Sequence, residues 1–212
     1  MPPLLFATFC IEGIIAIWAL FQWKQSEFQQ RFLIVFLTMI FMVEITESWM
    51  ALHNIHNLWL INVSSFGECL ALLGLFYNWK TKIKDKRLIA VIAILFVIIW
   101  CLSKFTFEPF DQIGSFTSGI AKLIEIAFAI WILFDVLKDP KANPKIEPRI
   151  WAASAVIIYA AGSLLLFALF YTMLRESHQL FRTVWPINWF LMDISFLLYA
   201  RAIWCPGTKS DL

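Results

Sequence analysis

The chain has 212 residues, of which 61% are hydrophobic and 15% are charged, and its formal net charge is +2. Water-soluble domains contain about 45–50% apolar and about 25% charged residues, so this composition excludes an ordinary soluble globular protein. The apolar residues form continuous runs, such as LIAVIAILFVIIW at 88–100, and these lack the alternation of a membrane β-barrel. The four cysteines form no C-x-x-C pair, which argues against a disulfide framework.

The apolar runs are as long as a helix that crosses the hydrocarbon layer, which needs roughly 20 residues. We therefore predict an all-α, polytopic transmembrane bundle of about seven helices in a single domain over residues 1–212. The first run has no basic start and no A-x-A-like cleavage site, so we expect it in the mature protein. In chain order, the helices are expected at about 4–22, 32–52, 58–79, 88–105, 118–138, 150–174 and 188–204.

The basic residues indicate how the bundle is oriented. If the predicted spans alternate in direction, thirteen Lys and Arg residues lie on one side of the membrane and four on the other. The smaller group is Lys104, Lys122, Arg175 and Arg182. Because basic loops stay in the cytoplasm, the N-terminus is predicted outside and the C-terminus inside, with a bacterial inner membrane as the expected location.

Acidic residues inside the apolar spans are the most informative feature of the sequence. An ionised carboxylate that faces lipid costs at least about 2.5 kcal/mol, so such groups normally face the bundle interior or find a partner. All of those found here fall at mid-depth or nearer the outer side. They are Glu12, Glu44, Glu47, Glu68, Glu125 and Asp193.

Local spacing indicates that these acids share a polar interior. Glu44 and Glu47 are three residues apart on one helical face, and Lys122 is placed to pair with Glu125 in the same way. Ser64 precedes Glu68 by four residues. We therefore predict a carboxylate-lined pocket that opens toward the outer side and binds a small ligand or a cation. Separate structural roles for the individual carboxylates are the alternative.

The cofactor predictions are modest. His53 and His56 in the outer HNIHN segment are three residues apart and close to carboxylates, which makes a divalent metal ion a possible ligand. Solvated loop histidines are the alternative. No retinal is expected, because the last predicted helix has no lysine to form a Schiff base.

Several segments together resemble parts of known membrane proteins. A basic inner loop precedes RFLIVFLTMIFMVEITES, which is followed by the turn HNIHNLW, by SSFGECLALLGLFY and by a lysine-rich loop. This layout is similar to that of small bacterial orphan seven-helix proteins, and to the seven-helix sensor modules that precede some histidine kinases. The resemblance implies a sensing or accessory role, and names no ligand.

These observations favour a receptor-like or accessory membrane protein that acts through a partner on its cytoplasmic face, with the 80–87 loop as the docking segment. A proton- or cation-coupled transporter is the first alternative. A metal-dependent intramembrane hydrolase is the second, so an enzyme is the less favoured class. The basic inner face is explained by the lipid bilayer, and no nucleic acid partner is predicted.

Overall fold

The computed structural model describes residues 3–112, 114–140, 143, 145–176, 184 and 186–205, and the side chains of these except 3, 4 and 167–176. This part of the chain is helical and contains no strand. Its long helices, with one short 3₁₀ turn, are α1 (Pro3–Phe21), η1 (Gln22–Lys24), α2 (Phe28–Leu52), α3 (Leu58–Trp79), α4 (Ile83–Thr106), α5 (Ser115–Leu137), α6 (Pro148–Glu176) and α8 (Pro186–Trp204).

The described helices confirm the predicted all-α class and match the seven predicted ranges. The largest differences are at two helix starts: α2 begins at Phe28 and α4 at Ile83, where the prediction placed them at 32 and 88. The extra residues, 28–31 and 83–87, are mostly polar, so the helical backbone continues past the apolar run. Apolar length therefore underestimates these helices at one end.

Five of the described helical segments are long and apolar enough to cross a membrane, and they belong to α1, α2, α3, α4 and α6. The other two long helices, α5 and α8, carry charged residues of the bundle interior, including Lys122, Glu125 and Asp193. The chain thus has the composition and helix lengths of an integral membrane protein.

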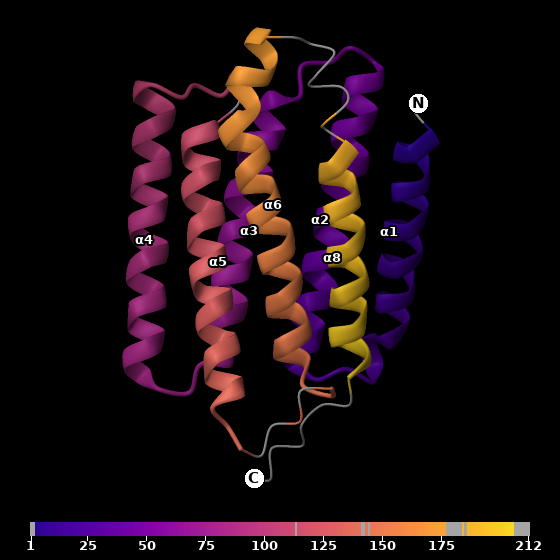
Figure 1. Ribbon diagram of the computed structural model, residues 1–212, viewed down its shortest axis with the longest axis vertical. Coiled ribbons are helices and arrows are strands. Elements are labelled where there is room, and N and C mark those ends of the chain that lie inside the picture. Colours follow the sequence, from indigo (N-terminus) through magenta and orange to yellow (C-terminus); the bar gives the residue numbers. More distant parts are fainter. Residues whose placement is uncertain are drawn as a thin grey trace.

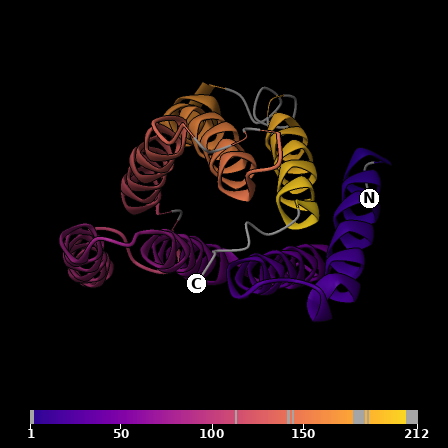
Figure 2. The ribbon, with the colours of Figure 1, turned by 90° about the horizontal axis from the view of Figure 1, so that it is seen from below.

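The helices form two layers. Figure 2 shows α1, α2, α3 and α4 side by side in one row, with α5, α6 and α8 in an arc on one side of it. Within the arc, α6 packs between α5 and α8. The arc meets the row where α5 contacts α3 and α4, and where α8 contacts α1 and α2. The helices α2, α3, α5, α6 and α8 therefore surround a common interior.

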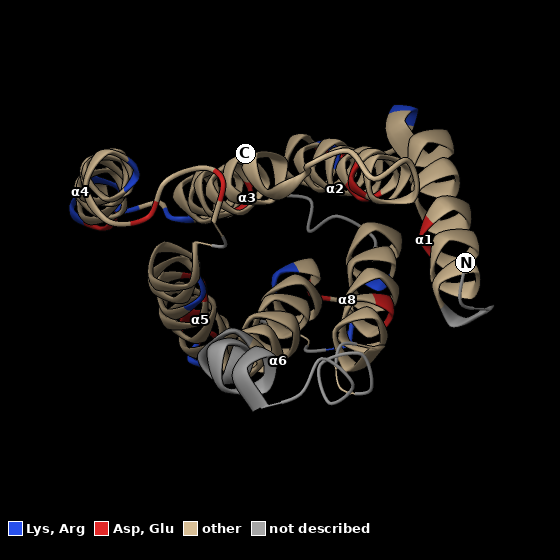
Figure 3. Ribbon diagram, turned by 90° about the horizontal axis from the view of Figure 1, so that it is seen from above, with Lys and Arg blue, Asp and Glu red and all other residues tan. Residues whose placement is uncertain are grey.

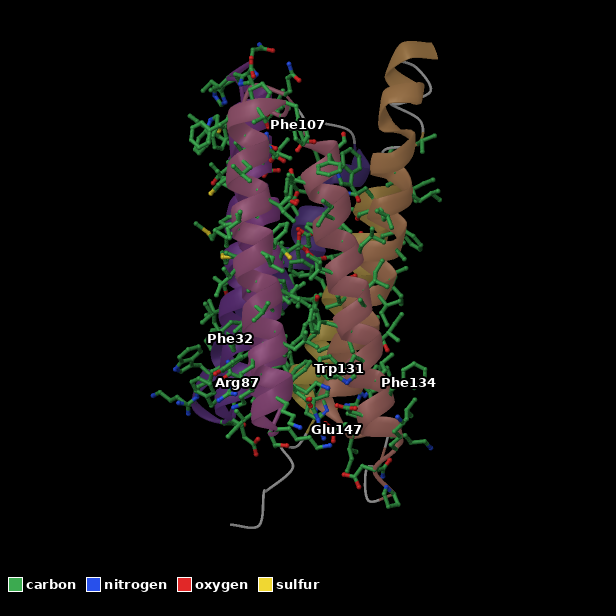
Figure 4. The ribbon with its side chains drawn as sticks, turned by 90° about the vertical axis from the view of Figure 1, so that its left-hand side faces the viewer. Phe32, Arg87, Phe107, Trp131, Phe134 and Glu147 are labelled. Atoms are coloured by element: carbon green, nitrogen blue, oxygen red, sulfur yellow. The ribbon has the colours of Figure 1, made fainter. Side chains whose placement is uncertain are left out.

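The two ends of the bundle differ in charge. The connections α1–α2, α3–α4 and α5–α6 lie at the same end as the last turn of α8 (Figure 1). We call this the basic end, because its described residues include Lys24, Arg31, Lys80, Lys82, Lys84, Lys86, Arg87, Lys138, Lys145, Arg149 and Arg201. In Figure 4, Arg87 and Glu147 lie at this end and Phe107 at the other. Lys141, Arg182, His178 and Lys209 lie outside the described residues.

Polar side chains fix the helix termini. The Gln30 amide accepts a hydrogen bond from the Glu27 backbone N–H at the start of α2 (3.1 Å), and donates to the carbonyls of Ile203 (3.2 Å) and Cys205 (2.7 Å) at the end of α8. One side chain thereby satisfies groups at two helix ends. After α2, Asn54 adopts a left-handed conformation (φ 54°), which asparagine tolerates better than most residues.

The half of the bundle near the basic end is filled by apolar side chains. Phe36 of α2 meets Tyr199 of α8 edge to face, with ring centroids 5.7 Å apart, and Phe76 of α3 stacks near Phe128 of α5. All four side chains are buried. Further buried residues of this core are Leu33, Ile34, Leu37, Leu72, Leu73, Ala129, Ile132, Val136 and Ala202. This packing separates the polar interior from the basic end.

Candidate functional site

A cavity of about 310 Å³ lies in the interior between the two layers. Residues of α2, α3, α5, α6 and α8 line it, so it is built from helices far apart in the sequence. Its polar lining consists of Glu44, Glu47, Ser64, Ser65, Glu68, Lys122, Tyr159, Asn188, Ser195 and Tyr199. This volume falls at the lower end of the range for small-molecule sites, roughly 300–1,000 Å³.

The cavity lies toward the end opposite to the basic end. Its α2 residues, 39–47, belong to the second half of that helix, and its α3 residues, 60–68, to the first half. These two halves adjoin the α2–α3 turn, which lies at the end opposite to the basic loops (Figure 1). The sequence prediction placed the acids at this depth, because apolar runs and basic loops define position along the membrane normal.

Lys122 is the centre of the cavity's charge network. Its ammonium donates to Glu68 of α3 (2.7 Å) and to Glu125 of its own helix (3.0 Å), and it lies 4.7 Å from the centre of the Tyr159 ring. Lys122 and Glu125 are buried, whereas 14% of the Glu68 side chain is exposed. The predicted pairing of Lys122 with Glu125 is confirmed, and Glu68 completes a bridge between α3 and α5.

Glu44 and Glu47 lack such a cation. Both line the cavity, as expected for residues three apart on one face. Glu47 accepts a hydrogen bond from the Ser64 hydroxyl (3.0 Å). None of the ion pairs within the described residues includes Glu44 or Glu47. The described lining therefore contains three acidic residues and a single basic one, Lys122, which already binds two carboxylates.

Glu12 and Asp193 lie beside the cavity rather than in its described lining. Thr8 of α1 donates a hydrogen bond to Asp193 of α8 (3.2 Å), so these two helices meet through polar groups. Glu12, one turn after Thr8, is fully buried and interacts electrostatically with Asp193 and Glu44. Figure 3 shows acidic residues in red on α1, α2 and α8. The predicted single set of acids is thus divided, because only Glu44, Glu47 and Glu68 belong to the described lining. Glu125 lies outside that lining and pairs with Lys122, while Glu12 and Asp193 lie at the α1–α8 contact.

The two candidate metal-binding histidines are exposed at the α2–α3 turn. His53 Nδ1 lies 2.8 Å from the Trp49 carbonyl, and its ring packs on the Trp49 indole with centroids 4.6 Å apart. His56 is exposed, and His178 lies outside the described residues. No group of three or more His, Cys, Asp or Glu side chains among the described residues could hold a metal ion. Metal binding by His53 and His56 therefore stays a prediction without further ligands.

The sequence interpretation missed the aromatic part of the site. Tyr159, Phe196 and Tyr199 line the cavity and give it rings beside its carboxylates. Tyr159 is the large polar residue within the small-residue run of α6, ASAVIIYAAGS, and that contrast was the available signal. Phe196 and Tyr199 lie in an aromatic-rich helix, where nothing in the sequence separates cavity-facing rings from others.

A second buried polar group was also missed. Lys104, near the end of α4, donates to the Asn62 amide oxygen (2.7 Å) and lies 3.8 Å from Glu108. Glu108 accepts hydrogen bonds from the backbone N–H groups of Phe116 (2.6 Å) and Thr117 (3.2 Å) at the start of α5. These contacts join α3, α4 and α5 and satisfy a helix N-terminus, which is a structural role.

Comparison with protein-family models, with curated proteins and with solved structures found no match to this chain.

Proposed function

We propose that this chain is a receptor-like integral membrane protein with seven spans, whose acidic cavity faces the outer side and binds a small organic cation. In this proposal the N-terminus lies outside, the basic end lies in the cytoplasm, and a partner protein receives the signal there. The observation that carries the proposal is the excess of carboxylates over cations around a cavity of about 310 Å³.

The charge of the lining favours a cationic ligand. Lys122 already pairs with two carboxylates, those of Glu68 and Glu125. The cavity-facing Glu44 and Glu47 are therefore left without a cation among the described residues. Carboxylates in a membrane interior are costly unless they are paired or protonated. A bound cation would supply the missing counter-charge, and hydrogen bonds to a charged group contribute roughly 1.5–3 kcal/mol each.

The rest of the lining favours an organic ion over a bare metal ion. Apolar residues supply much of the wall, among them Met39, Ile40, Val43, Leu60, Ile61, Val63, Met192 and Phe196. Ca²⁺ and Mg²⁺ take six or more oxygen ligands in a defined geometry, and no group of three or more His, Cys, Asp or Glu side chains among the described residues could hold a metal ion. An ammonium group on an apolar body matches both parts, because aromatic rings such as Tyr159 also attract cations.

The orientation rests on the basic end. Eleven of the Lys and Arg side chains at that end belong to residues that the structure describes, and short basic loops remain on the cytoplasmic side of membranes. The cavity lies toward the other end, so a ligand would enter from outside. The packed core of Phe36, Phe76, Phe128 and Tyr199 between the cavity and the basic end favours a receptor over a continuous transport path.

Residues 80–87, which comprise the α3–α4 connection and the first turn of α4, are the proposed docking segment for the partner. Lys80 is buried there, pairs with Asp135 of α5 and lies 3.4 Å from the centre of the Trp131 ring. Lys82, Lys84 and Arg87 are exposed. Lys80 therefore holds this segment against α5, and we propose that the three exposed cations bind an acidic partner.

Equilibrium binding to protein in lipid nanodiscs tests the cation site, with 2-phenylethylammonium as the probe. The double variant Glu44→Gln/Glu47→Gln should weaken binding by at least tenfold, since each lost charged contact costs more than about 1.4 kcal/mol. Asp111→Asn is the matched control, because Asp111 is an exposed carboxylate outside the cavity lining. If both variants lost affinity for the probe equally, or if neither lost affinity, a site at Glu44 and Glu47 would be refuted.

Flux measurements separate the receptor from a transporter. Proteoliposomes that contain the wild-type chain should show no uptake of the labelled probe above protein-free vesicles. Saturable uptake that Glu44→Gln abolishes would overturn the receptor assignment and leave the cation site in place.

A further inference from the structure

Glu12 of α1 is fully buried, yet neither of its carboxylate oxygens has a hydrogen-bond partner among the described residues. It lies in the middle of an apolar helix, and at the next position Gly13 lets the Phe41 ring of α2 approach: a Cβ there would be 2.9 Å from the ring. A buried carboxylate without partners is among the most costly arrangements in a protein interior. Glu12 therefore requires a ligand that the neighbouring side chains do not supply.

The groups that face Glu12 are also acidic. α1 packs on α2 and α8, and the charged side chains that interact with Glu12 from these helices are Glu44 and Asp193. Asp193 accepts a hydrogen bond from Thr8 through Oδ2, while its buried Oδ1 has no partner among the described residues. No ion pair of the described residues includes Glu12 or Asp193.

A proton is the ligand that fits this geometry. Two carboxyl groups that share a buried site without a cation cannot both be ionised, as in the acid pairs that hold one proton between them. A metal ion would need several more oxygen ligands, and the described residues form no acidic or histidine group that could hold one. One proton on Glu12 removes the repulsion between its carboxylate and those of Glu44 and Asp193.

We infer that Glu12 and Asp193 form a second site, at the α1–α8 contact, which binds one proton. The electrostatic interaction between Glu12 and Glu44 links this proton to the cavity. When a cation in the cavity neutralises Glu44, the pair holds its proton less tightly and releases it to water. By reciprocity, the cation binds more tightly as the pH rises. This linkage rests on the proposed function, whereas the proton site itself does not.

Infrared difference spectroscopy on ligand-free protein tests the site directly. The wild-type spectrum near neutral pH should contain the carbonyl band of a buried protonated carboxylic acid, and Glu12→Gln should remove it. Asp193→Asn provides a second variant, because it should alter the same band if the pair shares the proton. Asp111→Asn should leave the band unchanged.

Two outcomes would overturn the proton site. One is a carbonyl region that is identical in wild type, Glu12→Gln and Asp193→Asn. The other is a band that disappears when sodium replaces choline in the buffer, which would assign the site to a metal ion.

Proton release on binding of 2-phenylethylammonium tests the linkage, measured with an indicator dye in weak buffer. Wild type should release protons, and Glu12→Gln should bind the probe with release reduced at least twofold. Unchanged release in Glu12→Gln would refute the linkage. In the wild-type protein, absence of probe binding together with the carbonyl band would refute the cation cavity only. Probe binding without the carbonyl band in the wild-type protein would refute the proton site only.

Discussion

Lys122 is the residue on which the interior charges of this bundle depend. It is buried and joins Glu68 and Glu125, on two different helices, in one network. Buried ion pairs of this kind contribute little net stability compared with apolar packing, but the loss of one partner leaves an uncompensated charge. Lys122 therefore fixes the geometry of the cavity wall more than it strengthens the fold.

Lys122→Met should destabilise the protein by about 3–5 kcal/mol, because Glu68 and Glu125 would lose their shared cation. Thermal unfolding in detergent, with Lys82→Met as the control at an exposed position, measures the difference. Adding Glu125→Gln to Lys122→Met should restore part of the loss. A double variant no more stable than the single one would show that the network does not carry this energy.

For individual residues, the sequence predicted part of the candidate site. The acids were identifiable because charge in an apolar run is conspicuous, and the Lys122–Glu125 pair followed from its spacing. The partner on α3, Glu68, was identifiable as an acid but not as the acceptor of Lys122, because contacts between helices depend on how each helix is rotated. The same uncertainty explains why Glu12, Glu125 and Asp193 were assigned to the cavity itself.

The start of α5 is capped by a residue from outside the helix. Gly114, at the N-cap position, has no side chain that could accept hydrogen bonds from the backbone N–H groups of the first turn. Glu108, in the preceding segment, accepts these hydrogen bonds instead, and it also accepts one from the Thr117 hydroxyl (2.7 Å). The sequence placed this start at 118, three residues late, since a cap from a residue outside the helix leaves no local pattern.

Glu108→Ala should destabilise the protein by about 1–2 kcal/mol, the usual effect of removing a helix N-cap. The backbone N–H groups of Phe116 and Thr117 would lose their acceptor, and buried Lys104 its nearest carboxylate. Glu108→Gln keeps one acceptor oxygen and should lose less. Thermal unfolding compares the three proteins, and equal midpoints would contradict the capping role.

The small residues of α6 allow close packing, as the ASAVIIYAAGS run indicates. A Cβ at Gly162 would lie 2.1 Å from Leu191 Cδ1 of α8. Gly162→Ala should therefore cost about 1–3 kcal/mol, as other overpacked positions do. Gly67→Ala is the matched control, because a Cβ there has no neighbour within 4 Å.

The companion change Leu191→Ala should relieve the strain of Gly162→Ala, so that the two substitutions together cost less than their sum. Thermal unfolding of the single and double variants supplies the comparison. Additive losses would mean that α6 and α8 do not meet at this point.

For the whole molecule, the sequence was most informative along the membrane normal. Apolar runs predicted the helices, and basic loops predicted two unlike ends, because both signals accumulate over many residues. The lateral arrangement was not predictable. The row of α1 to α4 and the arc of α5, α6 and α8 (Figure 2) depend on side-chain packing between helices that are apolar on nearly all faces.

The proposed orientation can be read from the labelling of introduced cysteines. After replacement of the exposed native Cys10 and Cys101 by serine, His56→Cys should react with a membrane-impermeant maleimide in intact cells. Lys82→Cys should react only after the membrane is permeabilised, because it lies at the basic end. The reverse pattern would place the cavity on the cytoplasmic side.

The charge preference of the wild-type cavity is the most direct test of the central claim. The Kd of 2-phenylethylammonium should be compared with that of 2-phenylethanol, which has the same apolar body and no charge, for protein in nanodiscs. Glu44 and Glu47, which form no ion pair among the described residues, predict a preference for the ammonium ion of roughly tenfold or more. Equal affinities, or tighter binding of the alcohol, would contradict the account.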